Sequence, residues 1–148
     1  MSGLSLQYDL SALDEINRHL YRLTRFDKRK LAEEIGSYVV DEIVDRLHAQ
    51  RTFDGKHFIK SKAAKKRGGL TLIDTGALRD SYTYQAKTDG SEVLIGSDSD
   101  YAAIHHFGGM TGRGGNSKIE ANPVLGLSED NKREIGDMAL DAIKRVLR

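Results

Sequence analysis

The sequence predicts an α+β fold in which a small antiparallel sheet with a hairpin is covered by two or three amphipathic helices. Two helical segments come first, two strand-like segments follow, and another helical segment lies near the C-terminus. Because the helices are segregated from the strands and do not alternate with them, a parallel sheet is not expected. The 148 residues fit a single domain over residues 1–148, since a chain of this length buries enough surface for one core.

The three long helices are predicted from apolar residues that recur at helical spacing. The first covers residues 11–23, the second runs from Asp27 to about Ala49, and the third follows a capping residue, Ser128. A stripe that repeats every three to four residues is typical of a helix that packs one face on a core. The stripes are Leu13, Ile16, Leu20 and Leu23; Leu31, Ile35, Val39, Ile43 and Leu47; and Ile135, Met138, Ala142 and Val146.

The strands are predicted between these helices. Residues 81–87 alternate apolar and polar side chains, and residues 92–96 contain a short apolar run. The polar turn at residues 88–91 joins them into an antiparallel hairpin. A stable sheet needs three or more strands, so either residues 118–121 join the hairpin or a neighbouring chain does. The predicted buried face of the first strand is Tyr82, Tyr84 and Ala86.

Two segments are predicted to be surface loops. Residues 56–67 contain six lysines and arginines and no acid, with neither helical nor strand periodicity. In residues 108–115, five of eight residues are glycine, and ordering so many glycines is costly in backbone entropy. We therefore expect a basic loop and a flexible glycine-rich loop that becomes ordered on assembly. A short helix capped by Asp98 or Ser99 should precede the second loop and end at Gly108.

Composition limits the kinds of partner. The 23 basic and 22 acidic residues nearly cancel, which gives no global attraction to nucleic acid or anionic lipid. Without cysteine there is no disulfide framework and no thiolate metal site. No apolar run approaches the roughly 20 residues of a membrane helix, so no membrane partner is expected. Residues 1–10 lack the pattern of a secretory signal, which favours synthesis and residence in the cytoplasm.

No catalytic or cofactor-binding constellation is apparent. The adjacent His105 and His106 would diverge on a helix, which disfavours a shared metal ion. Residues 97–100 lack the ligands of a calcium loop, and the glycine-rich segment lacks the lysine and flanking elements of a phosphate loop. There is no nucleophile elbow and no paired carboxylates. The sequence predicts a non-enzyme without cofactor or metal.

Nucleic acid binding is the alternative that the charges leave open. The basic segment 56–67 can neutralise phosphates, and the aromatic residues Phe53 and Phe58 lie near it. No recognised RNA or DNA motif surrounds it. A solvated loop, or a patch that meets an acidic neighbour in an assembly, explains the same residues, so nucleic acid is possible but not expected.

Three short sequence motifs are distinctive enough to compare with known families. Residues 72–81 read Leu-Ile-Asp-Thr-Gly-Ala-Leu-Arg-Asp-Ser, residues 93–96 read Val-Leu-Ile-Gly, and residues 101–109 read Tyr-Ala-Ala-Ile-His-His-Phe-Gly-Gly. Their order and spacing resemble the phage virion morphogenesis family, the tail completion proteins of Mu-like phages and prophages. In a later segment that resembles the family's pre-helix segment, Asn122 and Val124 stand where an arginine and an aromatic residue are common. The matching structural motif is Leu72, Thr75, Gly76, Leu78, Ser81, Gly96, Tyr101, His105, Phe107 and Gly108.

These motif residues also have local roles in folding. We expect Thr75 to cap the turn after it, Leu78 to anchor the corner in the core and Gly96 to end a strand. Phe107 and Gly108 are expected to close the short helix with a buried ring and a left-handed cap. A pattern made of corners and caps is better suited to building a particle than to catalysis.

The resemblance implies a structural virion protein that acts in tail completion or head-tail joining. Such a protein joins copies of itself in a ring and meets the tail tube on one side and the head connector on the other. It would be present in the host cytoplasm during assembly and then in the virion, at the neck or tail end. The candidate interface residues are Lys62, Lys65, Lys66, Arg67 and Arg113.

Overall fold

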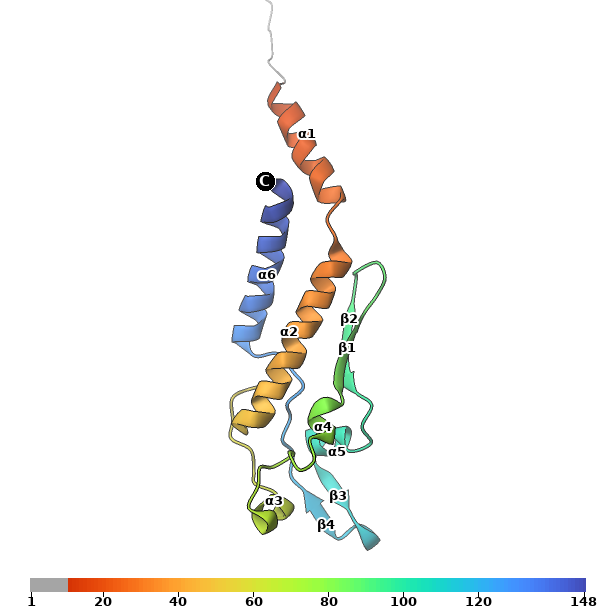
Figure 1. Ribbon diagram of the computed structural model, residues 1–148, viewed down its shortest axis with the longest axis vertical. Helices are drawn as coiled ribbons and strands as arrows, with labels where there is room; N and C mark the ends of the chain where they lie inside the picture. The colour runs from red at the N-terminus through yellow and green to blue at the C-terminus, as the bar shows by residue number, and fades with distance from the viewer. Residues whose placement is uncertain (1–10) are drawn as a thin grey trace, which may run out of the picture.

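The computed structural model describes residues 11–148, and the side chains from residue 14 onward. In this part of the chain, α2 lies at the centre, with α6 on one side and the β1–β2 hairpin on the other (Figure 1). α1 lies at one end of an elongated molecule, and α3 and the β3–β4 hairpin lie at the other. The predicted α+β class is confirmed. The elements are α1 (Ser11–Thr24), α2 (Lys28–Ala49), α3 (Lys62–Arg67), α4 (Ala77–Asp80), β1 (Tyr82–Ala86), β2 (Val93–Ser97), α5 (Ala102–Phe107), β3 (Gly109–Thr111), a 3-10 turn (Arg113–Gly115), β4 (Ser117–Ile119) and α6 (Glu129–Leu147).

The predicted stripe of α2 forms the centre of the core. Val39, Ile43 and Leu47 are buried and pack with Tyr82 of β1 and Val124. The helix begins where the Asp27 side chain accepts a hydrogen bond from the main-chain N–H of Lys30, at 3.0 Å. An acceptor at this position satisfies an N–H that has no partner within the helix.

The β1–β2 hairpin packs against α2 through the predicted face, although within it only Tyr82 is buried and Tyr84 is 40% exposed. Its strands are antiparallel, and Tyr84 pairs with Ile95. A Cβ atom built on Gly36 of α2 would lie 2.5 Å from the Tyr84 ring, so the helix and the strand meet where no side chain fits. The turn contains Gly90 with φ of 70°, and a Cβ there would lie 2.3 Å from the main chain of Lys28. Both glycines are therefore required by close contact.

A buried polar network joins α2 to the segment before α6. Arg46, only 8% exposed, donates to the carbonyls of Val124 at 2.6 Å and Gly126 at 2.8 Å, and also to the Oδ1 atom of Asn131. Asn131 in turn donates to Tyr38 and Glu42, at 2.9 and 2.8 Å. Burial lowers the pKa of Arg46, while Glu42 opposes this shift.

The predicted α6 is confirmed, with Ser128 as its N-cap. The Ser128 hydroxyl accepts from the N–H of Asn131, and the Asn131 side chain accepts from the N–H of Ser128, which is a capping box. Asn131 therefore contributes both to this cap and to the network around Arg46.

The glycine-rich segment is not a loop, as the sequence had suggested, but part of a second hairpin. β3 pairs with β4 in antiparallel register, with Met110 opposite Lys118. Residues 118–121 were correctly expected to contain a strand, but it does not join β1 and β2. Within the described residues there are two separate two-stranded sheets. The turn between β3 and β4 uses positive φ angles at Gly112, Gly114 and Gly115, which glycine adopts without strain.

Two further predictions were wrong. Residues 62–67 form the helix α3 and not a loop, because Ser61 caps its first turn and Gly68, in the left-handed conformation, ends it. Phe107 is 78% exposed and not buried, and Gly108, with φ 72° and ψ 176°, is not a left-handed cap. The ring of Phe107 lies against His106, at 4.7 Å between centroids, and the core is closed without it.

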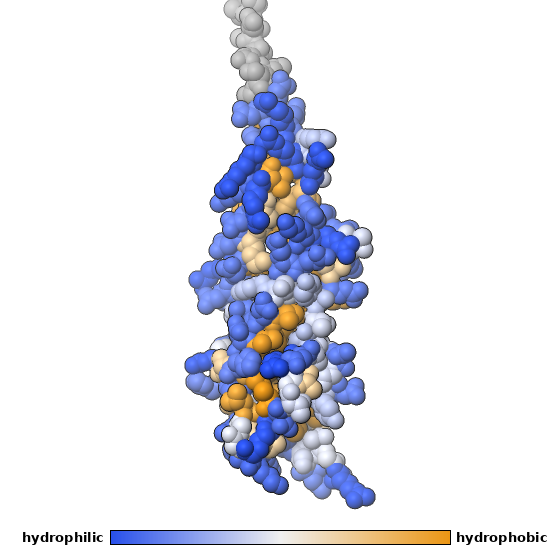
Figure 2. Space-filling model, in the orientation of Figure 1, coloured by the Kyte–Doolittle hydropathy of each residue, from blue (hydrophilic) through white to orange (hydrophobic). Residues whose placement is uncertain are grey.

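α1 is helical as predicted, but its apolar stripe is incompletely covered. Ile16, Leu20 and Tyr21 are each more than half exposed, and the side chain of Leu13 lies outside the described residues. The main packing contact of α1 is with α6, where Arg22 donates to the carbonyls of Leu147 and Arg148. Figure 2 shows apolar side chains on this face near α1 and α6, and again in the lower half of the molecule.

Candidate interface groove

The specific sequence blocks and the basic segment meet at one groove of about 770 Å³, named here the corner groove. One wall comes from α3 and the residues before it, namely residues 59–63, 65 and 67. A second wall is residues 71–78, which lead into α4. Tyr101 and His105 contribute from the start and middle of α5, and residues 117–120 close the groove along β4. Elements that are far apart in the sequence therefore form one surface.

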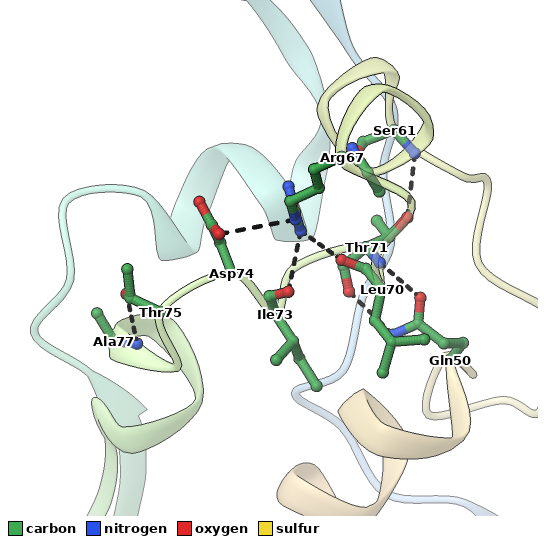
Figure 3. Close-up of polar contacts among 10 residues, drawn as sticks. Gln50, Ser61, Arg67, Leu70, Thr71, Ile73, Asp74, Thr75 and Ala77 are labelled. Atoms are coloured by element: carbon green, nitrogen blue, oxygen red, sulfur yellow. Dashed lines mark hydrogen bonds and ion pairs between the residues drawn. The ribbon is translucent and has the colours of Figure 1, made fainter.

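The α3 wall is fixed by hydrogen bonds to residues 70–73. Thr71 is buried, and its main-chain N–H and carbonyl both bond to the side-chain amide of Gln50, at 2.8 and 2.9 Å. The Thr71 hydroxyl accepts from the N–H of Ser61, at 3.1 Å, directly before α3 (Figure 3). Gln50 itself has positive φ and ends α2, so the end of the central helix sets the position of α3.

Arg67 joins the C-terminal end of α3 to residues 70–74 by hydrogen bonds and an ion pair. Its Nη2 atom donates to the carbonyls of Leu70 at 2.5 Å and Ile73 at 2.9 Å, and its Nε atom lies 3.6 Å from Asp74 (Figure 3). Leu72, within this stretch, has φ of 64°, which is uncommon for a residue with a side chain. The guanidinium therefore holds a tight reversal of the main chain.

The predicted corner at residues 74–78 is a single turn of helix. Gly76 is the N-cap with φ of 88°, and the Thr75 hydroxyl accepts from the N–H of Ala77 at 3.3 Å. Leu78 packs against the core, as expected. The Ser81 hydroxyl donates to the carbonyl of Leu78 and lies 2.6 Å from that of Ser97, so the corner is joined to the base of the β1–β2 hairpin.

Asn122, which also lines the groove, connects three segments of the chain. It is 4% exposed, and its side chain bonds both the N–H and the carbonyl of Ile59, at 2.9 and 3.2 Å. Its own N–H donates to the carbonyl of His105, at 2.8 Å. Val124, two residues later, is buried in the core. The two positions that depart from the common family pattern thus both point inward in this chain.

The groove combines a basic rim with an apolar interior. Within the described residues, no carboxylate lies within ion-pair distance of Lys60, Lys62 or Lys65, whereas Arg67 is paired with Asp74 and Lys118 with Glu120. Burial lowers the pKa of His105, which favours its neutral form in the fold. The unpaired positive charge of the groove therefore lies on and just before α3.

The groove collects most, but not all, of the predicted residues. Lys66 lies on α3 outside the groove lining, and Arg113 lies in the 3-10 turn between β3 and β4. The predicted residues that line it are Leu72, Thr75, Gly76, Leu78, Tyr101, His105, Lys62, Lys65 and Arg67. The motif residues outside it are Ser81, Gly96, Phe107 and Gly108.

Sequence reasoning missed the polar residues that position these walls. Gln50, Thr71 and Asn122 act through contacts with residues remote in the sequence, and no local pattern predicts these contacts, although Asn122 stands out as a departure from the common family pattern. The cap of α3 at Ser61, by contrast, had a usable signal in the Ser-Lys-Ala-Ala order before a basic run that ends in glycine.

In residues 11–148, no helix has the length and apolar content needed to cross a bilayer. In the same part of the chain, no three His, Asp or Glu side chains are grouped so that they could hold a metal ion.

Comparison with known proteins identifies the family. No solved structure matches this chain. Mu-like prophage FluMu G protein 2 of Haemophilus influenzae is 39% identical over 74 residues, which are 50% of this chain and 52% of that protein, so the chain spans about half the length of this curated relative. The model of the phage virion morphogenesis family matches residues 8–144. The resemblance seen in the sequence is thereby confirmed, and the chain belongs to the phage virion morphogenesis family.

Proposed function

We propose that this chain is a non-enzymatic structural protein of a phage or prophage virion that acts in tail completion or head-tail joining. The observation that carries the proposal is the corner groove, where six motif residues and three predicted interface cations form one surface. These residues form a corner, a short helix and a basic rim. Such features suit contact with another protein better than catalysis. The partners would be tail tube and head connector proteins, met in the host cytoplasm and retained at the neck or tail end of the virion.

Self-association into a ring is part of this proposal. Leu13, Ile16, Leu20 and Leu23 follow the three-four-three spacing of a coiled-coil seam, and the described members of this stripe are only partly covered. Because α1 packs mainly against α6 and leaves Ile16 and Leu20 more than half exposed, its open face is available to a second copy. A closed ring needs contacts between unlike surfaces, and an end helix that meets a neighbour's body provides one.

Particles made without the protein test the proposal. When the gene is deleted from the phage or prophage, we expect electron microscopy to show separate heads and tails, or tails of abnormal length. Supplying the intact chain from a plasmid should restore joined particles. Normal infectious particles from the deletion strain would contradict the proposed function.

Nucleic acid binding through residues 56–67 is the second candidate, because Lys60, Lys62 and Lys65 have no ion-pair partner in the described part of the chain. Phosphate contacts predict a steep loss of duplex DNA affinity as salt rises. Titration of duplex DNA at several salt concentrations is the test. Absence of binding at low salt would exclude this candidate.

A further inference from the structure

We propose that the corner groove binds an extended acidic segment of a partner protein, which adds as a third strand to the free edge of β4. This inference rests on the proposed function. It specifies which kind of partner segment the groove would bind and through which interactions. Three features carry it: the unpaired edge of β4, the apolar interior of the groove and the lysines opposite the strand.

The edge of β4 faces the groove. Residues 117–120 are consecutive, and all four line the groove, although successive side chains of a strand point to opposite faces. A lining that includes each residue of Ser117–Ile119 in turn indicates that the groove follows the edge of β4. β3, the hydrogen-bonded neighbour of β4, contributes nothing to this lining, so the groove lies on the side of β4 away from β3.

That edge has unused hydrogen-bonding capacity. In the described part of the chain, the main chain of Ser117–Ile119 bonds to β3 and to no other segment. A two-stranded sheet is marginal by itself, and an added strand satisfies the outward N–H and carbonyl groups of its edge. The β3–β4 hairpin is therefore suited to accept a strand from another protein.

The groove also determines what kind of strand fits. Leu72, Leu78 and Ile119 provide apolar lining, while Lys60, Lys62 and Lys65 stand on the opposite wall without carboxylate partners among the described residues. An extended peptide presents alternate side chains to opposite sides. One set of apolar side chains can cover the interior, and acidic side chains near it can pair with the lysines.

A protein ligand fits this surface better than a nucleic acid. A phosphodiester backbone would have to lose water against the apolar lining, and it has no N–H groups to donate to the carbonyls of β4. A peptide meets both conditions, because it brings donors, acceptors and apolar side chains together. The lysines then select for acidic sequences and speed association.

The binding test uses the full chain and a synthetic peptide of about seven residues in which glutamate alternates with valine. In NMR titrations, we expect chemical shift changes concentrated at residues 117–120 and 60–65. The same peptide with lysine in place of glutamate should not bind. Lys62→Glu and Lys65→Glu should each weaken binding by about tenfold. Lys66→Glu is the matched control, since it changes the same charge on the same helix outside the groove, and it should have little effect.

Backbone recognition is tested separately. In an added strand, alternate N–H groups of the peptide point to β4. Two peptides, N-methylated on one or the other alternate set of amides, should therefore differ, with one losing binding and the other keeping it. Equal loss, or none, would overturn strand addition.

Other occupants give other results. Shift changes in the groove that depend on protein concentration without peptide would indicate a segment of a second copy. Duplex DNA that shifts the same residues, with Lys66→Glu as harmful as Lys62→Glu, would indicate nucleic acid. Either result would overturn the acidic peptide proposal, as would equal binding of the glutamate and lysine peptides.

Complementation separates this inference from the proposed function. If the deletion strain lacks joined particles and the intact chain restores them, the proposed function stands. The Lys62→Glu/Lys65→Glu double variant should then fail to restore them, and Lys66→Glu should succeed. Full restoration by the double variant would remove the groove proposal alone.

Discussion

Two regions near the C-terminal end of α2 use polar side chains in opposite ways. In the last turn of α2, Arg46 is buried against the segment before α6, and its guanidinium is bonded to Val124, Gly126 and Asn131. Beyond the C-terminal end of α2, in the corner groove, the ammonium groups of Lys62 and Lys65 have no carboxylate partner among the described residues. A buried charge needs hydrogen-bond partners within the fold, whereas an exposed charge is solvated by water and stays free to pair with another protein. The difference separates the residues that hold the chain together from those suited to contact.

Substitution of the buried Arg46 should give the largest effect on stability. Arg46→Met keeps an unbranched apolar stem but removes the guanidinium that donates to the carbonyls of Val124 and Gly126 and to Asn131. We expect a loss of about 3–5 kcal/mol in the free energy of unfolding, because the former partners stay buried and unpaired. Chemical denaturation measures it. Arg133→Met, at an exposed position on α6, should change stability by less than about 0.5 kcal/mol. Equal effects of the two substitutions would contradict the role of the network.

Close packing of α2 against β1 should give the next largest effect. Gly36→Ala places a Cβ atom 2.5 Å from the Tyr84 ring and 2.9 Å from its Cβ atom, so the strand must move. Overpacking of this kind costs about 1–3 kcal/mol, more than the gain in helix propensity.

A matched glycine in α6 provides the control. A Cβ atom on Gly136 meets nothing within 4 Å, so Gly136→Ala should stabilise the protein by about 0.5–1 kcal/mol. The two substitutions should thus have opposite signs in thermal or denaturant unfolding. Stabilisation by both would show that Tyr84 does not rest on α2.

The same contrast explains how far the sequence could predict the structure. Long elements were predictable because burial repeats over many residues, as in the stripe of α2 that contains Val39, Ile43 and Leu47. Short elements were not, because a few local groups decide them. Ser61 and Gly68 define α3, and the positive φ angles of glycines shape the turn between β3 and β4.

The candidate site was predictable in its parts but not in its assembly. The motif blocks and the basic segment were recognised separately, yet their convergence depends on hydrogen bonds from Gln50 to Thr71 and from Asn122 to Ile59. Such pairs are far apart in the sequence and have no periodic signature. Phe107 was misjudged for a related reason, since an aromatic side chain favours burial but does not show which surface will cover it.

At the α1 end, a substitution should change association more than folding. Leu20→Asp places a charge on the exposed apolar stripe, and we expect self-association to weaken by about tenfold or more. Light scattering over a range of protein concentrations measures it. Arg18→Asp, on the polar side of the same helix, is the control and should leave the mass distribution unchanged. If Leu20→Asp associates like the unmodified chain, α1 is not the contact.

The smallest expected effect concerns His105 in the corner groove. Because burial lowers its pKa in the folded state, the unfolded chain takes up the proton first as the pH falls below about 6.5, and stability then decreases. For one group, this slope is at most about 1.4 kcal/mol per pH unit. The glutamine of His105→Gln cannot titrate. The unmodified chain should therefore lose unfolding free energy relative to the His105→Gln variant as the pH falls through this range. The carboxyls of Asp80 and Asp89, whose pKa values are lowered by hydrogen bonds, lose their stabilising effect from about pH 5 downward, but both proteins share them, so their effect cancels in the difference. A difference that stays constant from neutral pH to about pH 4.5 would mean that His105 is solvated like a free histidine, and that the groove around it is more open than its lining indicates.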